Sequence, residues 1–182
     1  MSSADTARCT YEASRNEILE RIRLRDNAQL AYLGAVGATF SIATSGHDSV
    51  LLVLPYLALA ATLLVCQHDW TIATLCTFIA EELRAYLDGL REAAPSWEFS
   101  RTLSQYSIAA VRLRTTAHLV LIAAPAVFGQ FWVKRTHATP GILFTSAWWL
   151  GWLALLGAAI VIGATYSQRI KNYKVTRWLN QT

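Results

Sequence analysis

Two neighbouring side chains in the middle of the sequence are of the types that move protons or hold ions. His68 and Asp69 are adjacent and are followed by Trp70. Ionisable side chains at membrane depth are costly and often functional, so a pair of this kind could relay protons or bind an ion. The favoured interpretation is structural: the three residues form an interfacial cluster, with the tryptophan at the level of the lipid headgroups.

A second candidate group lies further along the chain, where Arg112 and His118 are separated by five residues. This spacing resembles the Arg-x(4–6)-His pattern of HEPN ribonucleases. The resemblance implies that Arg112 and His118 would support attack of a ribose 2′-hydroxyl on a phosphodiester. His118, however, falls in the first turn of a predicted membrane span, where RNA could hardly reach it. We therefore do not favour a nuclease.

The cysteines give no sign of a metal or redox centre. Cys9, Cys66 and Cys76 form no CxxC pair and no Cys-His spacing of the kind that binds zinc. In the topology derived below they lie on or near the cytoplasmic side, where thiols stay reduced. We expect inert cysteines, no disulfide, no metal and no cofactor.

The composition indicates the class of protein in which these residues lie. Of the 182 residues, 54% are hydrophobic and only 15% are charged, and the mean hydropathy is +0.31. Soluble domains have about 25% charged residues, so the chain is predicted to be a membrane protein. The same composition excludes a disordered chain and a disulfide scaffold. The length fits one domain, residues 1–182.

Four uncharged stretches are predicted to cross a bilayer, which takes about 20 apolar residues. They form two hairpins, because a tight turn over 46–48 joins the first two and a short turn over 134–140 joins the last two. Pro55 and Pro125 each remove one backbone hydrogen bond, and kinks are expected there. The predicted spans are about 28–45, 49–67, 115–133 and 141–166.

The segments outside the spans are predicted to be helical as well, because their apolar residues recur at helical spacing. Before the first span the spacing is heptad-like, over Tyr11, Ile18, Ile22 and Gln29. We therefore expect an all-α, integral membrane four-helix bundle, in which two transmembrane hairpins continue as long helices into the cytoplasm. The predicted cytoplasmic segments are about 8–27, 68–92, 98–114 and 167–180.

The distribution of Lys and Arg predicts the orientation, because cytoplasmic loops are enriched in both. The predicted outer side has only Lys134 and Arg135, and all other basic residues fall on the opposite side. Both termini are therefore placed in the cytoplasm. The basic C-terminal segment is expected to anchor to anionic lipid headgroups, and nucleic-acid binding is a weaker alternative. The anchor residues are Arg169, Lys171, Lys174, Arg177 and Trp178.

Two further sets of residues are candidates for an oligomer or partner interface. Gly34 and Ala38 belong to a small-xxx-small pattern that lets helices approach closely, within one chain or between subunits of a homo-oligomer. Charged residues beside the heptad seam are candidates for docking a cytoplasmic protein. Their structural alternative, that they hold the bundle together by ion pairs, is the more probable of the two. These residues are Arg15, Glu17, Arg21 and Arg25.

The sequence also shows a weak family resemblance over roughly its first hundred residues. The motif YEASRNEILERIRLR at 11–25 precedes a glycine-rich span, a proline-bearing second span, Glu-Glu-Leu at 81–83 and Trp-Glu at 97–98. This pattern resembles small uncharacterised bacterial multi-pass membrane proteins. The plan of the second hairpin resembles transmembrane effectors of bacterial anti-phage systems. The resemblance implies a protein that perturbs the inner membrane when a partner signals.

The leading hypothesis is a non-enzymatic inner-membrane protein that forms a homo-oligomer. It acts as a membrane effector or channel-like component, and its cytoplasmic half-bundle docks a partner. The alternative is a membrane-embedded enzyme or transporter that uses His68 and Asp69, or His118.

Overall fold

The computed structural model describes residues 3–83, 108–136 and 141–179, and nearly all of them are helical. Helix α1 spans Ser3–Thr44. A 3-10 helix, η1 (Asp48–Val53), precedes α2 (Leu54–Phe78), and a π-helical turn, η2 (Ile79–Leu83), follows it. Helices α5 (Ile108–Thr136) and α6 (Ile142–Leu179) complete this part of the chain. No strand occurs in the described ranges, so the expected all-α class is confirmed.

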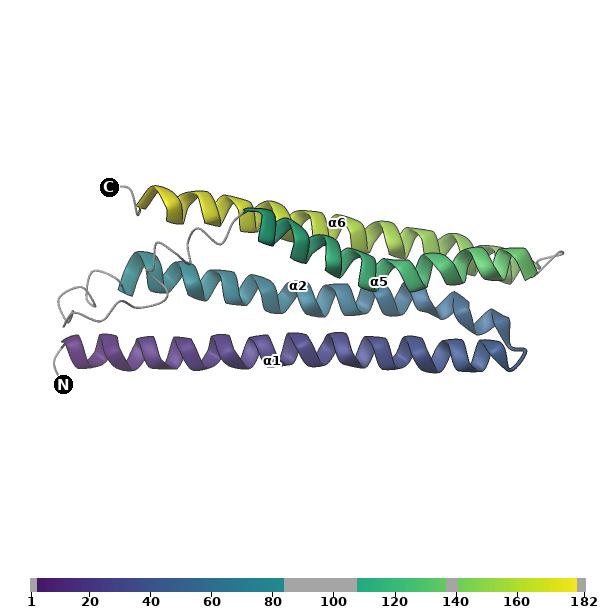
Figure 1. The fold of residues 1–182 in the computed structure, drawn as a ribbon, viewed down its shortest axis with the longest axis horizontal. Coiled ribbons are helices and arrows are strands. Elements are labelled where there is room, and N and C mark those ends of the chain that lie inside the picture. Colours follow the sequence, from purple (N-terminus) through teal and green to yellow (C-terminus); the bar gives the residue numbers. More distant parts are fainter. Residues whose placement is uncertain (1–2, 84–107, 137–140, 180–182) are drawn as a thin grey trace.

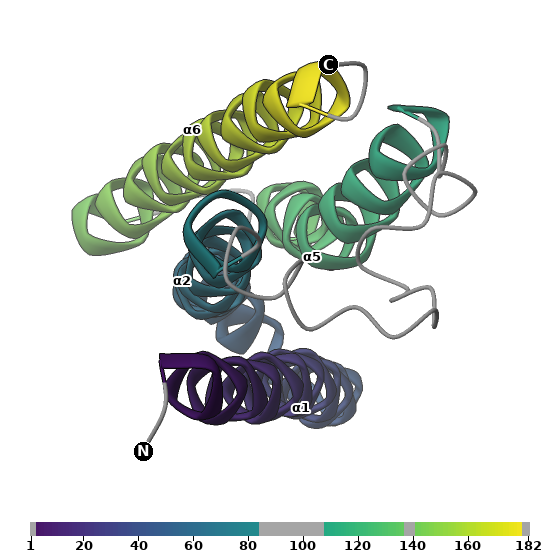
Figure 2. The same cartoon turned by 90° about the vertical axis from the view of Figure 1, so that its left-hand side faces the viewer.

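The helices run alongside one another, with α2 in contact with each of the other three (Figure 1). Helix α1 packs on one side of α2 and α6 packs on the other side (Figure 2). Helix α1 begins and α6 ends at the same end of the bundle (Figure 1). Two antiparallel hairpins therefore lie together, with α2 as the element that joins them.

The first hairpin turn shows why one proline prediction is wrong. Gly46 has φ +95°, a conformation that favours glycine, and its N–H donates to the carbonyl of Ala43 at 3.0 Å. The 3-10 helix η1 then delays the start of α2, so Pro55 lies in the first turn of that helix. At this position no intrahelical N–H is needed, and Pro55 starts the helix instead of breaking it. Pro125 lies inside α5, as expected.

One hydrophobic core occupies the end of the bundle that contains the first hairpin turn. Leu54, Ala58, Ala126 and Val133 are completely buried there, and Tyr32 of α1 belongs to the same cluster. These residues come from α1, α2 and α5, and Leu155 joins them from α6. The uncharged halves of all four helices are thus held together by small and branched apolar side chains.

A second, smaller core lies toward the opposite end, between α1 and the last turns of α2. Ile18 of α1 is 6% exposed and Ile79 is 2% exposed, and Tyr11 and Ile22 pack against them. The heptad-like seam predicted before the first span is therefore confirmed at these three positions of α1. Its fourth residue, Gln29, lies outside this cluster and has a polar partner, described below.

Three helical stretches are long and apolar enough to cross a membrane: Asp48–Phe78, Thr115–Thr136 and Ile142–Gln168, with mean hydropathies of 2.4, 1.5 and 1.9. The predicted first span, 28–45, is not among them. That segment lacks charges, but Gln29 and several Ser, Thr and Gly residues lower its hydropathy. Large apolar side chains of α6 are exposed, among them Leu153 and Ile160 at 62% and 63%. Such a surface fits a membrane protein.

Aromatic residues at the end of α5 and the start of α6 contact one another. The Phe131 and Trp152 rings meet edge to face with centroids 5.7 Å apart, and Trp148 and Trp152 also meet edge to face, at 5.8 Å. The Lys134 ammonium lies 4.8 Å from the centroid of the Trp148 ring. These contacts hold the end of α5 against the start of α6.

Candidate functional site

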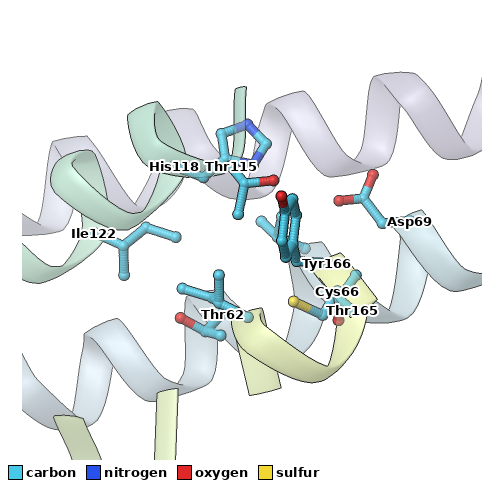
Figure 3. Close-up of a pocket in the computed structure, with 10 residues that line it drawn as sticks. Thr62, Cys66, Asp69, Thr115, His118, Ile122, Thr165 and Tyr166 are labelled. Atoms are coloured by element: carbon cyan, nitrogen blue, oxygen red, sulfur yellow. The ribbon is translucent and has the colours of Figure 1, made fainter. Parts of the chain in front are cut away.

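A small cavity lined by both polar and apolar side chains lies between α2, α5 and α6 (Figure 3). Its volume is about 20 Å³, counted as the space open to the centre of a water molecule. One water needs about 10 to 15 Å³ on this measure, so the cavity admits one or two. The lining residues are Thr62, Val65, Cys66, Asp69, Thr115, His118, Ile122, Ile162, Thr165 and Tyr166.

Asp69 contributes a buried carboxylate to this cavity and joins it to α1. The residue is 5% exposed, and its Oδ1 accepts a hydrogen bond from Nη1 of Arg25 at 3.3 Å. The Arg25 side chain is 12% exposed, and its Nη2 is closer to Asp26, at 2.7 Å. Buried ion pairs are costly to break because each charge has lost its hydration. The pair therefore fixes the lateral position of α1 against α2.

Two further polar contacts connect α1 with α5 beside the same cavity. The side-chain nitrogens of Gln29 and His118 are 3.0 Å apart, and the donor depends on the histidine tautomer and the orientation of the amide. One α-helical turn further on, the Tyr32 hydroxyl donates to the carbonyl of Ile122 at 2.6 Å. Pro125 lies three residues after Ile122 in α5. Helix α1 thus presents Arg25, Gln29 and Tyr32 to its neighbours from one face.

Helices α6 and α2 contribute hydroxyl groups to the lining of the cavity. The Tyr166 hydroxyl accepts a hydrogen bond from Nε of Arg112 at 3.3 Å, and the Thr165 hydroxyl donates to the Val161 carbonyl at 2.9 Å. Thr62 is completely buried, and its hydroxyl has no hydrogen-bond partner among the described residues. A buried hydroxyl left unpaired costs free energy, so this position calls for an explanation.

The structure separates the two residues that the sequence had paired. His68 does not line the cavity. By helical register it shares a face of α2 with Ile72 and Leu75, which pack toward α1, and its buried Nδ1 has no hydrogen-bond partner in the described part of the chain. Asp69 instead lies at one cavity with His118. The structure therefore gives no support to His68 and Asp69 acting as one functional pair, because adjacent helical positions point about 100° apart.

Arg112 and His118 do not converge on a common point in the single chain. Arg112 is exposed and binds Tyr166 of α6, whereas His118 faces Gln29 of α1. Two groups that act on one phosphodiester have to reach the same reacting atoms. Within one chain, this geometry gives no support to the nuclease alternative.

The charged residues predicted beside the seam lie mainly in contacts within the chain. Glu17 and Arg21 form an ion pair of 2.6 Å between neighbouring turns of α1, and both are half-buried. Arg15 is also half-buried, and Arg25 is the buried partner of Asp69. Arg25 therefore supports a role in holding the bundle together, whereas the Glu17–Arg21 pair lies within α1 and does not distinguish that role from docking.

Some predicted residues lie partly or wholly outside the described structure. Helix α6 continues to Leu179, so the backbone of the predicted lipid anchor is helical, but the side chains of Arg169, Lys171, Lys174, Arg177 and Trp178 lie outside the described part. Residues 84–107 also lie outside it, and with them residues 84–92 of the predicted segment 68–92 and residues 98–107 of the predicted segment 98–114. Among the described residues, no three His, Cys, Asp or Glu side chains form a group that could hold a metal ion.

Comparisons with protein family models, with curated proteins and with solved structures found no match to the chain. The candidate site is therefore defined by its geometry.

Proposed function

We propose that this protein self-associates through α1, and that the assembled form acts as a membrane effector or channel-like component. In this proposal the uncharged half of α1 lies in the bilayer because it packs along α2, a candidate span, although its own hydropathy is lower. The observation that carries the proposal is a face of small residues on α1 that the single chain leaves uncovered. Ala31, Gly34 and Ala38 are exposed, and so is Ser41 one turn later.

This outer face lies opposite the face that packs within the chain. Tyr32, Val36 and Ala43 belong to the first core cluster, and they point toward α2 and α5. A Cβ placed on Gly34 would meet nothing within 4 Å. Small residues at this spacing let a second helix approach closely, which is how helices associate in lipid without a hydrophobic driving force.

A comparison with α6 shows that small residues are used differently in the two helices. Gly151, Ala154 and Ala158 are buried. A Cβ on Gly151 would collide with the Gln130 side chain and come within 3.2 Å of Pro55. These three small residues of α6 therefore serve packing inside the chain, whereas Gly163 of the same helix is exposed. Those of α1 have no such role, and a second copy of the chain is the occupant that supplies a matching small face.

A conducting path in the assembled form would run between subunits. The interior of the single chain is closed by Leu54, Ala58 and Ala126, which are completely buried side chains of the first core. A pore needs a continuous polar lining. The outer face of α1, with Thr44 and Ser41 exposed, offers polar groups where two or more copies would meet.

We place the protein in a bacterial inner membrane with both termini in the cytoplasm. The support is the excess of Lys and Arg at the end of the bundle where α1 begins and α6 ends, against Lys134 and Arg135 at the other end. In this orientation the charged halves of the helices stand in the cytoplasm, where a partner protein would dock.

The test compares two glycine substitutions in the full-length protein. Gly34→Leu fills the outer face of α1, and Gly163→Leu is the matched control, because a Cβ on Gly163 in α6 also meets nothing within 4 Å. The mass of each detergent-solubilised complex is measured by light scattering, and ion flux is measured from liposomes that contain the same preparation. We expect an oligomer and flux for the wild type and for Gly163→Leu, and a monomer without flux for Gly34→Leu.

Three results would contradict the proposal in different ways. A wild-type monomer would overturn self-association, and an unchanged mass for Gly34→Leu would overturn the assignment of the interface to α1. A defined oligomer that never conducts would overturn the channel-like role.

Asp69 and His118 line the same cavity, and this favours a second function, which is transport of a small ion. The cavity is far smaller than the 300 to 1,000 Å³ typical of sites for organic ligands, with about 20 Å³ open to a water centre. An enzyme acting on an organic substrate in this cavity is therefore less well supported than a transporter.

A further inference from the structure

We infer that the cavity between α2, α5 and α6 binds one small monovalent cation, either sodium or a hydronium ion. This inference concerns a ligand site inside one chain, so its test does not depend on self-association through α1. Four observations carry it: the size of the cavity, an unpaired buried hydroxyl, the set of oxygen atoms and the arrangement of charges.

The size of the cavity restricts the ligand to the size of a water molecule. About 20 Å³ is open to the centre of such a particle, and Val65, Ile122 and Ile162 form apolar walls. An organic metabolite or a phosphate does not fit this volume. A dehydrated sodium ion or a hydronium ion does.

An unpaired hydroxyl among the lining residues favours a polar occupant of the cavity. Thr62 lines it and is completely buried, yet its Oγ1 has no hydrogen-bond partner among the described residues. Buried polar atoms in folded proteins nearly always have a partner, and a bound water or ion would supply one here. Most other threonines of α2, such as Thr74, donate to the carbonyl four residues earlier in their own helix.

The remaining polar atoms are of the kind that hard cations prefer. Thr115, Thr165 and Tyr166 supply hydroxyl oxygens, and Asp69 supplies a carboxylate (Figure 3). Oxygen ligands are preferred by hard cations. The Tyr166 oxygen accepts the Arg112 N–H, which leaves the guanidinium engaged at the edge of the site.

The charges around the cavity favour a cation over an anion. The Asp69 carboxylate lines the cavity, and the Arg25 guanidinium that faces it also binds Asp26 at the shorter distance, 2.7 Å against 3.3 Å. Within this described cluster two carboxylates thus share one guanidinium. An anion in the cavity would meet the Asp69 charge, whereas a cation would be attracted to it.

Sodium and hydronium ions both bind to oxygen ligands of this kind. A proton, unlike sodium, can also be taken up by His118, the titratable base that lines the cavity. The groups around it are Gln29 and Arg25 on α1, Asp69 on α2, Tyr166 on α6 and Arg112 on its own helix. A site that takes sodium responds to sodium at constant pH. A site that takes a proton responds to pH at constant sodium.

The experiment measures the unfolding temperature of the purified full-length protein in detergent. Sodium chloride is compared with choline chloride at equal ionic strength, at mildly acidic and mildly alkaline pH. A ligand that binds only the folded state raises the unfolding temperature, and we expect about 5 °C at saturating sodium. The test variant is Thr62→Val, which keeps the shape of the side chain and removes its hydroxyl. The matched control is Thr74→Val, in an exposed part of the same helix.

The possible outcomes distinguish a sodium site, a hydronium site and a cavity that binds neither ion. A sodium-dependent rise that Thr62→Val loses and Thr74→Val keeps supports a sodium site. A rise on acidification without a sodium effect, lost in the same variant only, supports a hydronium site. The inference is overturned if Thr62→Val responds to sodium and pH as the wild type does, or if the wild type responds to neither. In that case the cavity holds water alone or stays empty, and Thr62→Val should raise the unfolding temperature, because it removes an unpaired buried hydroxyl.

Discussion

The ion pair between Arg25 and Asp69 gives the sharpest test of how α1 is held. Arg25→Met removes the guanidinium that faces the Asp69 carboxylate but keeps much of the apolar stem of the side chain. Both groups are well buried, with exposures of 12% for the arginine side chain and 5% for the aspartate side chain. We expect the variant to unfold more easily, because the aspartate loses a compensating charge where bulk solvent screens it little.

The magnitude follows from the burial and the distance. Removing one partner of a buried ion pair costs about 3 to 5 kcal/mol. The contact of 3.3 Å is long for a charge-assisted hydrogen bond, and Asp69 has further polar neighbours. We therefore expect about 3 kcal/mol, at the lower end of the range. Arg23→Met is the matched control, since the Arg23 side chain is 77% exposed and 4.0 Å from Glu20. It should change the stability by less than about 1 kcal/mol.

A double variant separates the pair from the individual side chains. Replacing a buried ion pair by apolar residues is often neutral or stabilising, so Arg25→Met combined with Asp69→Leu should recover at least half of the loss. The free energy of unfolding is measured by denaturant titration in detergent, with tryptophan fluorescence as the signal. The reasoning is refuted if Arg25→Met matches Arg23→Met, or if the effects of the two substitutions simply add.

Two other predictions concern packing. Ile79→Ala should lower the free energy of unfolding by about 2 to 4 kcal/mol, since this side chain is 2% exposed in the second core. A loss below about 1 kcal/mol in the same titration would show that the second core is loosely packed. Gly151→Ala should destabilise by about 1 to 3 kcal/mol through the collision with Gln130 and Pro55. Gly163→Ala should be neutral or slightly stabilising, and equal thermal shifts for the two glycine variants would contradict the close approach of α6 to α2.

Parts of the fold that depend on local spacing could be predicted from the sequence. The seam of Tyr11, Ile18 and Ile22 packs as predicted, because a stripe of apolar residues has to be covered wherever the helix lies. Pro55 was misjudged because the turn before it is longer than the sequence suggested, with a 3-10 helix over Asp48–Val53. The first span was overestimated because absence of charge was the criterion, and hydropathy also counts residues such as Gln29.

The candidate site was predictable only in part, because it depends on the register between helices. That His68 and Asp69 face different directions follows from helix geometry alone. That Asp69 meets Arg25, 44 residues away, depends on how far α1 slides along α2. Gln29 occupies a position of the heptad-like seam where an apolar residue is expected. This polar residue was the one signal in the sequence that a polar partner such as His118 was required. Nothing in the spacing indicated Thr62 or Tyr166.

The position of the polar site in the bundle explains why α1 matters to both proposals. The site lies between the two hydrophobic cores, and α1 passes it with Arg25 and Gln29 on its inner face. Less than three turns later the same helix carries Gly34 on its outer face. Because Thr62→Val touches only the cavity and Gly34→Leu only the outer face, the two variants separate occupancy of the site from assembly.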